Sequence, residues 1–382
     1  MIMGFETIGK SHDELWSQYS GQFPVQQRLV YLNHAAVSPL CRPAAEAMRW
    51  LAEDAMEYGS LHYGDWLETY EGLRLAAARL IGADRGEIAL VKNTSEGIAT
   101  VAMGLDWHSG DKIVAFREEF PANYYPWKRL EATGVQVEWL SYLDPLDRID
   151  EACRGARLLA ISFVQYLSGH RVDLEAIGGI CQRHGCAYLV DAIQGLGAFP
   201  VDVRRAHIDA LAADGHKWLL GPEGCGILFV SRDFQESVQP VEFGWTNVAG
   251  YADYASRDMT LRADAGRYEC GTLNTIGCYG LRASIELLLE AGVAAVAPAV
   301  QRLGDLVAEG VQAKGYEVLG SRTPANGAGI VSFRKRGMQA EEILSRLKAA
   351  KVTAAARQGW VRVSPHFYIS PDDIGCMLEA LP

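Results

Sequence analysis

The sequence has few of the features that mark membrane proteins or nucleic-acid binders. Its longest apolar runs, such as the one from 292 to 300, fall well short of the ~20 residues that a membrane-spanning helix needs. Acidic residues outnumber basic ones by 47 to 36, which gives a formal net charge of −11, and Lys and Arg form no cluster. Because such a chain attracts nucleic acids and anionic membranes poorly, we expect neither as a partner.

Cysteine is scattered, and no C-x-x-C pair occurs among the eight. Cys181 and Cys186, with His184 between them, come nearest to a metal-binding pattern. Their spacing matches no usual zinc motif. We therefore predict reduced, half-buried thiols and no metal site.

The N-terminal segment lacks the marks of a targeting signal. Residues 1–13 mix Glu, Lys, His and Asp, with no apolar stretch and no cleavage-like end. This composition predicts an unprocessed protein of the cytoplasm.

The chain does contain alternating strands and helices, without repeats or linkers. Its 382 residues are 49% hydrophobic and 22% charged, as in a globular protein large enough for two domains. Short, almost continuously apolar strands separated by helices indicate a buried, mostly parallel sheet. We expect strands at 87–91, 112–116, 135–140, 156–164, 186–190, 208–213 and 226–230, with helices at 96–105, 123–132 and 174–184.

The two ends of the chain differ from this central part in their predicted pattern of helices and strands. Long helices are predicted before it, at 43–58 and 66–81, and after it, at 280–291 and 296–314. The tail reads as an α+β unit with strands at 329–333 and 360–364 and helices at 340–350 and 371–381. We therefore predict an α/β protein with a large domain at 20–285. A small α+β domain would comprise 286–382 together with 1–19.

Polar residues follow five of the expected strands, where open parallel sheets bind their ligands. Thr94 and Ser95 open a helix, whose free N–H groups suit a phosphate, although a simple helix cap explains them too. Asp191 ends an apolar strand, where a carboxylate needs a cation or donor. Lys217 precedes Trp-Leu-Leu, and a desolvated lysine is a good nucleophile. A phosphate site, a carboxylate and an amine together fit pyridoxal 5′-phosphate (PLP), since the carboxylate would keep the pyridine nitrogen protonated.

At this point the sequence resembles the class V aminotransferase and cysteine-desulfurase-like family of fold-type I PLP-dependent enzymes. The most specific part is Asp-x-x-Gln at 191–194, followed by Gly-His-Lys ending at Lys217. The blocks that carry the resemblance are Tyr31-Leu-Asn-His-Ala-Ala-Val-Ser-Pro, Asn93-Thr-Ser-Glu-Gly-Ile, Glu119-Phe-Pro-Ala-Asn-Tyr-Tyr-Pro-Trp, Val190-Asp-Ala-Ile-Gln-Gly, Asp214-Gly-His-Lys-Trp, Arg267-Tyr-Glu-Cys-Gly-Thr and Val363-Ser-Pro-His-Phe-Tyr.

The resemblance implies a role for each matching residue. Lys217 would be the catalytic lysine that binds the cofactor as a Schiff base, with Asp191 on the pyridine nitrogen and Gln194 on the phenolic oxygen. Phe120 would stack on the ring near Tyr166, and the phosphate would be held by Thr94, Ser95 and His216. Thr272 would reach the phosphate of a neighbouring subunit, which implies a homodimer with shared sites. The substrate carboxylate would pair with Arg357, near Asn33 and His34.

Three departures from the family bear on the reaction. No cysteine lies between Tyr279 and Gly375, where a desulfurase carries its persulfide-forming residue before the arginine. Tyr166 replaces a common asparagine, and Asp214 stands where serine is common. A desulfurase that passes sulfur as a persulfide is therefore disfavoured.

The predicted reaction runs through an external aldimine and a Cα carbanion of a small amino acid or derivative. We rank transamination first, with β-elimination (including C–S cleavage) close behind and epimerisation third, because the fold does not choose among them. The residues expected near the substrate, or equally in packing around it, are His34, Tyr124, Trp245 and His366. A nucleotide-binding oxidoreductase is disfavoured, because the Gly-rich stretches at 195–197 and 221–226 do not open a helix after a first strand.

Overall fold

The large part of the molecule is built on a seven-stranded sheet that is parallel except at one strand. The structure is a computed structural model and describes residues 12–382; the predicted absence of a targeting signal concerns a segment that lies mostly outside them. The strand order is β2-β8-β7-β6-β5-β3-β4, and β8 runs antiparallel to both of its neighbours. The strands are β2 (Ile88–Val91), β3 (Lys112–Phe116), β4 (Gln136–Leu140), β5 (Leu158–Ser162), β6 (Ala187–Asp191), β7 (Ala210–Asp214) and β8 (Gly226–Val230). The predicted α/β class with a mixed, mostly parallel sheet is confirmed.

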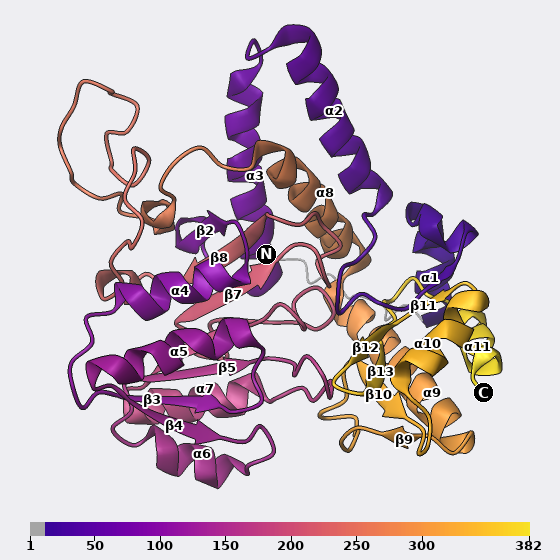
Figure 1. Cartoon of the computed structure of the whole chain (residues 1–382). Helices are drawn as coiled ribbons and strands as arrows, with labels where there is room; N and C mark the ends of the chain where they lie inside the picture. Colours follow the sequence, from indigo (N-terminus) through magenta and orange to yellow (C-terminus); the bar gives the residue numbers. More distant parts are fainter. Residues whose placement is uncertain (1–11) are drawn as a thin grey trace, which may run out of the picture.

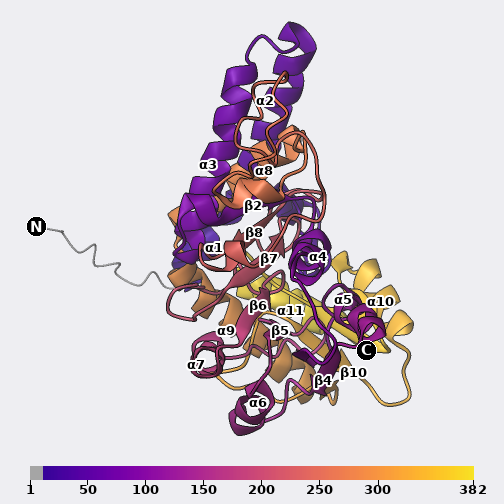
Figure 2. The same cartoon turned by 90° about the vertical axis from the view of Figure 1, so that its left-hand side faces the viewer.

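Helices cover both faces of this sheet, which explains why its strands are apolar throughout (Figures 1 and 2). All residues of β5, β7 and β8 are buried. Alternate side chains of β5 enter two different cores, so Leu158 packs with one set of helices and Leu159 with the other. One face carries α4 (Thr94–Gly104) and α5 (Tyr125–Leu130). The other carries α3 (Tyr63–Ile81), α6 (Leu146–Cys153), α7 (Leu174–His184) and α8 (Thr275–Ala291).

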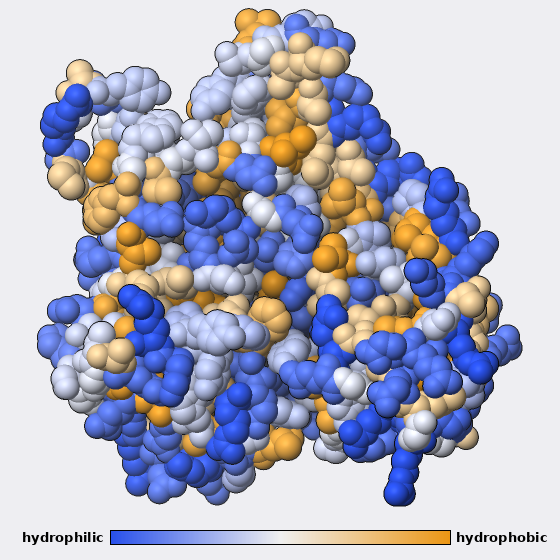
Figure 3. All heavy atoms as spheres, in the orientation of Figure 1, coloured by the Kyte–Doolittle hydropathy of each residue, from blue (hydrophilic) through white to orange (hydrophobic). Residues whose placement is uncertain are grey.

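A hairpin of two long helices projects from the large sheet. It consists of α2 (Arg42–Tyr58) and α3, and both helices pack against α8 (Figure 1). Apolar side chains gather along this hairpin on a face that is otherwise largely hydrophilic (Figure 3). Met56 and Leu61 are 76% and 72% exposed there.

A second, four-stranded sheet in the C-terminal part is wholly antiparallel, with the order β12-β13-β10-β9. Its strands are β9 (Glu317–Val318), β10 (Val331–Arg334), β12 (Ala355–Arg357) and β13 (Trp360–Val363), and its helices are α9 (Val293–Ala313), α10 (Ala340–Ala349) and α11 (Pro371–Ala380). The N-terminal α1 (His12–Tyr19) contacts α9, and β1 (Val30–Tyr31) pairs with β11 (Val352–Thr353). A domain boundary at 285/286 stays a prediction, and residues 1–11 of the segment assigned to the small domain lie outside the described chain.

Two helices of the described residues, α1 and α6, were not predicted from the sequence. Half of the eight residues of α6 are charged, and only Ile149, Ala152 and Cys153 are buried, so the apolar periodicity is too short to recognise. The predicted helix at 123–132 is also shorter than expected. Its α-helical part is α5 alone, with a 3₁₀ turn on each side.

Within residues 12–382, no single helix is long and apolar enough to cross a membrane. Only α8 and α9, bent by 86° at their junction, meet such a length and composition test as a pair. Both helices contribute many buried residues to the core.

Candidate active site

A cavity of about 340 Å³ lies at the carboxyl ends of the large-sheet strands, beside the small sheet. It brings together residues that are far apart in the sequence. The predicted residues that line it are Thr94, Ser95, Phe120, Tyr166, Asp191, Gln194, His216, Lys217 and Arg357. The strand-end argument therefore located the cavity, although the role of each residue stays a prediction.

Lys217 places its amine in this cavity from the loop after β7. Burial lowers the pKa of Lys217 to about 8, and Asp191 opposes that shift only in part. Nζ has no hydrogen-bond partner among the described residues, and it lies 5.6 Å from the centroid of the Phe120 ring. A lysine in this setting is neutral much more often than a solvated one, so it is a better nucleophile and base.

Asp191 is the last residue of β6 and is 3% exposed. Its Oδ1 accepts a hydrogen bond from the backbone N–H of Ile193 at 3.1 Å. Burial raises the pKa of Asp191 to about 6, and the charge of Lys217 acts in the opposite direction. A buried carboxylate of this kind is stabilised by a cationic donor such as a protonated ring nitrogen.

The start of α4 forms the anion-binding end of the cavity. The side chain of Asn93 caps the helix by accepting the Glu96 N–H, so the N–H groups of Thr94 and Ser95 remain available. The Thr94 hydroxyl oxygen accepts the Asp214 N–H at 2.9 Å, which leaves its own proton free to donate.

Asp214 adds a negative charge beside this anion site. Its Oδ2 lies 3.0 Å from His216 Nδ1, and its Oδ1 is buried without a partner among the described residues. Asp214 thus contacts both Thr94 and His216, two of the three residues expected to hold a phosphate. The contact with Thr94 is made by the backbone N–H of Asp214, and the contact with His216 by its carboxylate.

Gln194 is fixed by two hydrogen bonds. Its Nε2 donates to the Ala35 carbonyl at 3.0 Å, and its Oε1 accepts from Trp218 Nε1 at 2.9 Å. One amide proton of Gln194 therefore remains to face the cavity. The carbonyl of Trp218 accepts from His366 Nε2 at 3.1 Å, and a Cβ on Gly329 would lie 2.4 Å from the Trp218 ring. The residue after Lys217 is thus held by both parts of the molecule.

Glu119 lines a neighbouring cavity of about 570 Å³ and is 6% exposed. Oε1 accepts the Ser162 N–H at 2.7 Å and the Gln165 amide at 3.3 Å, and Oε2 accepts the Ser162 hydroxyl. Burial raises the pKa of Glu119 to about 8 against these donors, and the charge of Asp191 adds to the rise. Burial therefore favours the protonated form of Glu119 more strongly than in a solvated carboxyl group.

Sequence reasoning missed Arg362, which lines the same cavity from β13. Its Nη1 donates to the Tyr166 carbonyl at 2.7 Å, while Nε is buried without a partner in the part of the chain that the structure describes. No carboxylate pairs with it among the described residues, and burial together with the charge of Arg357 lowers the pKa of Arg362 to about 10. The available signal was an arginine within the otherwise apolar strand Trp360-Val361-Arg362-Val363.

Arg357 and Tyr166 occupy the mouth of the cavity. Arg357 is exposed, and within residues 12–382 it donates only to the Ala356 carbonyl, at 2.8 Å. The Tyr166 hydroxyl accepts from Gln358 Nε2 at 2.7 Å, and its ring meets Phe120 edge-on, with 5.4 Å between centroids.

Two histidines expected near the substrate, or equally in packing around it, have their rings packed in the core. His34 is fully buried, donating to the Ser364 carbonyl at 2.7 Å and accepting from the Tyr368 hydroxyl at 2.6 Å. His366 is also fully buried, and burial lowers its pKa to about 4. Both rings pack against Trp218. Asn33, beside His34, is likewise absent from the residues that line the cavity.

Three further expected residues lie outside the cavity within this chain. Tyr124 lines a neighbouring cavity of about 570 Å³, which shares Tyr166 with the first. Thr272 and Trp245 line a cavity of about 140 Å³ that shares no lining residue with the one around Lys217.

Comparison with known proteins places this arrangement in a family. Residues 30–368 match the family model "Aminotransferase class-V", and the chain belongs to that family of fold-type I, PLP-dependent enzymes. It is 32% identical to a probable cysteine desulfurase of Methanothermobacter thermautotrophicus, covering 94% of this chain and 95% of that one. It is 27% identical to the uncharacterized aminotransferase YcbU of Bacillus subtilis, covering 95% and 96%.

Solved structures share the fold. The cysteine desulfurase of Thermococcus onnurineus NA1 superposes with a TM-score of 0.88 at 26% identity, covering 95% of this chain and 96% of that one. The cystine C–S lyase C-DES gives a TM-score of 0.87 at 23% identity, covering 94% and 98%. The cavity fits the family's cofactor, since it combines an unpartnered amine, a buried carboxylate and the free N–H groups of a helix start.

Proposed function

We propose that this protein is a PLP-dependent lyase that cleaves the Cβ–S bond of a small sulfur-containing amino acid by β-elimination. The observation that carries the proposal is one cavity that holds Lys217, Asp191 and two arginines but has no cysteine among its described lining residues. The amine and carboxylate suit the cofactor, and the arginines suit an amino-acid carboxylate. Without a thiol at the site, sulfur has no protein acceptor there.

Each end of the cofactor has candidate partners. Lys217 Nζ is the amine that would hold the aldehyde, and Asp191 would accept the hydrogen bond of the ring nitrogen. Thr94, Ser95 and His216 would hold the phosphate, Gln194 would donate its remaining amide proton to the phenolic oxygen, and Phe120 would cover the ring near Tyr166. When bound, PLP supplies the electron sink for negative charge that develops at the substrate Cα.

Arg362 is the better of the two candidates for the substrate carboxylate. A buried guanidinium without a counter-ion carries a desolvation cost that a carboxylate ligand would offset. Arg357, more exposed and at the cavity mouth, would supply a second donor. Two arginines around one carboxylate would fix the Cα–H bond relative to Lys217 Nζ.

Lys217 would then move the proton. Its lowered pKa lets a neutral Nζ take the Cα proton, and the same ammonium would protonate the departing sulfur once the Cβ–S bond breaks. With cysteine and water as reactants, the balanced products are pyruvate, ammonia and hydrogen sulfide. The names of the relatives, which are cysteine desulfurases for the most part, support sulfur-containing substrates.

Transamination is the second candidate, and it is the reaction that we ranked first from the sequence alone. The relative named an aminotransferase supports it. In transamination Lys217 would deliver the proton to the cofactor, and in elimination to the departing sulfur. The same cavity residues would therefore serve either reaction.

Product analysis separates the two reactions. We would incubate the PLP-loaded protein with L-cysteine, L-cystine and non-sulfur amino acids, without any added keto acid. Sustained release of pyruvate with an equal amount of sulfide from L-cysteine, or of cysteine persulfide from L-cystine, supports the lyase. A single turnover that stops until a keto acid is added supports transamination and contradicts the lyase. With L-cysteine as the substrate, a protein-bound persulfide detected by alkylation and mass spectrometry would contradict the absence of a sulfur acceptor.

A further inference from the structure

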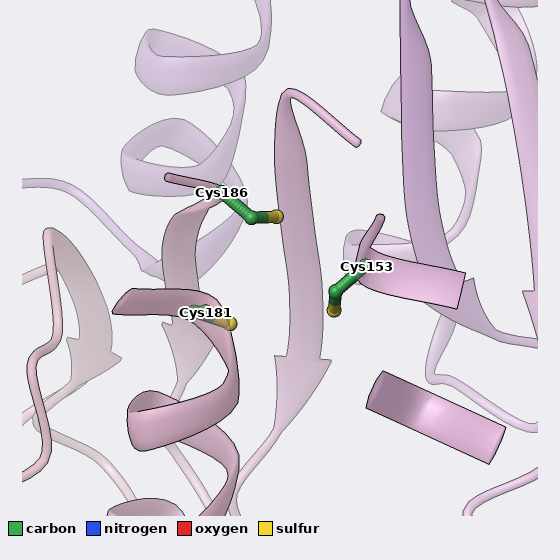
Figure 4. A group of neighbouring side chains, drawn as sticks. All are labelled: Cys153, Cys181 and Cys186. Carbon is green, nitrogen blue, oxygen red and sulfur yellow. The ribbon is translucent and has the colours of Figure 1, made fainter. Parts of the chain in front are cut away.

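Three thiols from separate parts of the sequence meet where α6 and α7 pack together, near the start of β6. Cys153 is the last residue of α6, Cys181 lies in α7, and Cys186 immediately precedes β6. Their Sγ atoms all lie within 4.8 Å of one another, and Figure 4 shows the three side chains directed toward a common space. The side chains are 0%, 1% and 4% exposed, respectively.

Local structure explains how two of these thiols come together. α7 ends at His184, and Gly185 adopts a left-handed conformation with φ of 60°. The chain therefore turns back, and the Cys186 N–H donates to the Cys181 carbonyl at 3.0 Å. Glycine suits this position because a side chain there would be strained. The packing of α6 on α7 brings in Cys153.

The spacing suits a metal held by three sulfurs. With metal–sulfur bonds of about 2.3 Å, trigonal thiolates stand about 4.0 Å apart, so these Sγ atoms need to move by less than ~1 Å. Within the described chain, no fourth Cys, His, Asp or Glu joins the group. The nearby His184 has its Nε2 3.3 Å from Asp150 Oδ1. Zinc in structural sites takes four ligands, whereas soft thiolates alone suit Cu(I).

The three thiols differ in how readily they ionise. Contact with Cys181 and Cys186 lowers the pKa of Cys153, whereas contact with Cys153 raises the pKa of Cys181 and of Cys186, so Cys153 is the first of the three to lose its proton. The Tyr188 hydroxyl is fully buried without a hydrogen-bond partner in the described chain, and Cys181 and Cys153 are among the groups that raise its pKa. It is thus a spare donor close to the cluster.

Access to the cluster comes from a surface cavity of about 620 Å³, which Cys181 and Cys186 line. The cluster is remote from the PLP cavity. Cys186 precedes β6 and Asp191 ends it, so about 17 Å of extended strand separates them. Whatever binds at the thiols would not contact the cofactor.

We propose that Cys153, Cys181 and Cys186 form a trigonal thiolate site for a soft monovalent cation, Cu(I). The site is independent of the proposed lyase activity. Binding displaces thiol protons into solvent, so the affinity for Cu(I) falls as the pH is lowered.

The test uses the PLP-loaded full chain, reduced and kept free of oxygen. The parent protein carries Cys270→Ser and Cys376→Ser, because these two thiols are the ones that are not buried. Cu(I) is supplied as its bathocuproine disulfonate complex, whose absorbance falls as copper moves to the protein. One equivalent per chain is expected, and Cys153→Ser, Cys181→Ser or Cys186→Ser should each weaken binding by roughly 100-fold or more.

The matched control is Cys225→Ser, which breaks the other buried thiol pair, with 3.8 Å between the sulfurs of Cys225 and Cys278. It should leave Cu(I) binding unchanged, and the PLP absorbance reports that each variant is folded. Undiminished binding in all three cluster variants, or loss in Cys225→Ser, would overturn the proposal. Should the serine variants not fold, X-ray absorption on the parent decides: three sulfur neighbours of copper support the site, and fewer overturn it.

Discussion

The amine of Lys217 and the ring of Phe120 face each other across the active-site cavity, with 5.6 Å between Nζ and the ring centroid. This distance lies within the range of a cation–π contact, so the ring can stabilise the ammonium when no other group is bound. Asp191 is the main group that opposes the loss of charge on Lys217. An aromatic ring and a buried carboxylate thus enclose the amine on which the proposed chemistry depends.

Lys217→Ala should abolish covalent capture of the cofactor. Reduction of the PLP-loaded protein with borohydride and digestion should give one pyridoxyl-labelled peptide containing residue 217, which the variant lacks. Lys92→Ala is a suitable control, because its exposed amine pairs with Glu96 outside the cavity. A pyridoxyl label that persists in Lys217→Ala would assign the lysine elsewhere.

The pH dependence of cofactor capture should reflect the lowered pKa of Lys217. Only the neutral amine attacks an aldehyde, so the rate for the cofactor-free protein should rise with pH and level off above about 8. A solvated lysine would keep rising toward 10.5, its ordinary value. Stopped-flow absorbance with pyridoxal, which lacks the phosphate, measures the rate; a rise that continues beyond pH 9 would refute a desolvated amine.

Arg362→Ala should raise KM for the amino-acid substrate by a factor of roughly 10 to 150, since a charge-assisted hydrogen bond contributes about 1.5–3 kcal/mol. Arg357→Ala should have a smaller effect, because its side chain is more exposed. The control substrate is cysteamine, which has no carboxylate and should be bound equally by the parent and both variants. Equal KM values for L-cysteine in Arg362→Ala and the parent would remove Arg362 from the substrate site.

Glu119 should make the protein less stable as the pH rises. Its pKa is about 8 in the folded state against 4.5 ordinarily, so the folded state binds one proton more than the unfolded state between these values. This contribution to the free energy of unfolding is fully present below pH 4.5 and is lost by about pH 8. Between these values the free energy of unfolding falls by up to ~1.4 kcal/mol per pH unit. Glu119→Gln should flatten this slope in denaturant unfolding measured at pH 5 and pH 8. Parallel slopes for variant and parent would show that Glu119 ionises normally.

Thr272 offers a test of the predicted homodimer with shared sites. It lies outside the cavity of its own chain, so we propose that it reaches the phosphate bound to a second copy. Lys217→Ala and Thr272→Ala chains, unfolded together and refolded, should then form hybrids with one intact site, giving up to about half of parental activity per hybrid at limiting PLP. The same variants refolded separately are the controls. No gain on mixing would place Thr272 outside any shared site.

Much of the cavity was predictable because it depends on local sequence. The apolar strands that precede Asp191 and Lys217 are recognisable from the sequence. Because the carboxyl ends of parallel strands meet at one edge of a sheet, the residues that follow these strands were expected to lie together. Arg362 was missed because it reaches the cavity from the other sheet, and a single strand does not reveal that contact. For His34 and His366 the sequence left substrate contact and core packing equally open, because both lie in active-site segments; their rings are packed in the core.

The cluster of Cys153, Cys181 and Cys186 could not be predicted from the sequence, because it depends on a contact between separate elements. Cys181 and Cys186 were visible as neighbours, but their partner Cys153 ends α6, a helix that the sequence did not reveal. Three-dimensional packing, and not spacing, supplies the third sulfur.

The two hydrogen bonds of Trp218, one to Gln194 and one from His366, have a practical consequence for protein engineering. A truncated chain ending after β8 would retain the whole seven-stranded sheet and Lys217. It would lose His366, the Gly329 surface against the indole, and both arginines. A fragment that ends after β8 should therefore hold Trp218, and with it the neighbouring Lys217, less firmly. Reassembly from two halves would have to restore the contacts of Trp218 before activity returned.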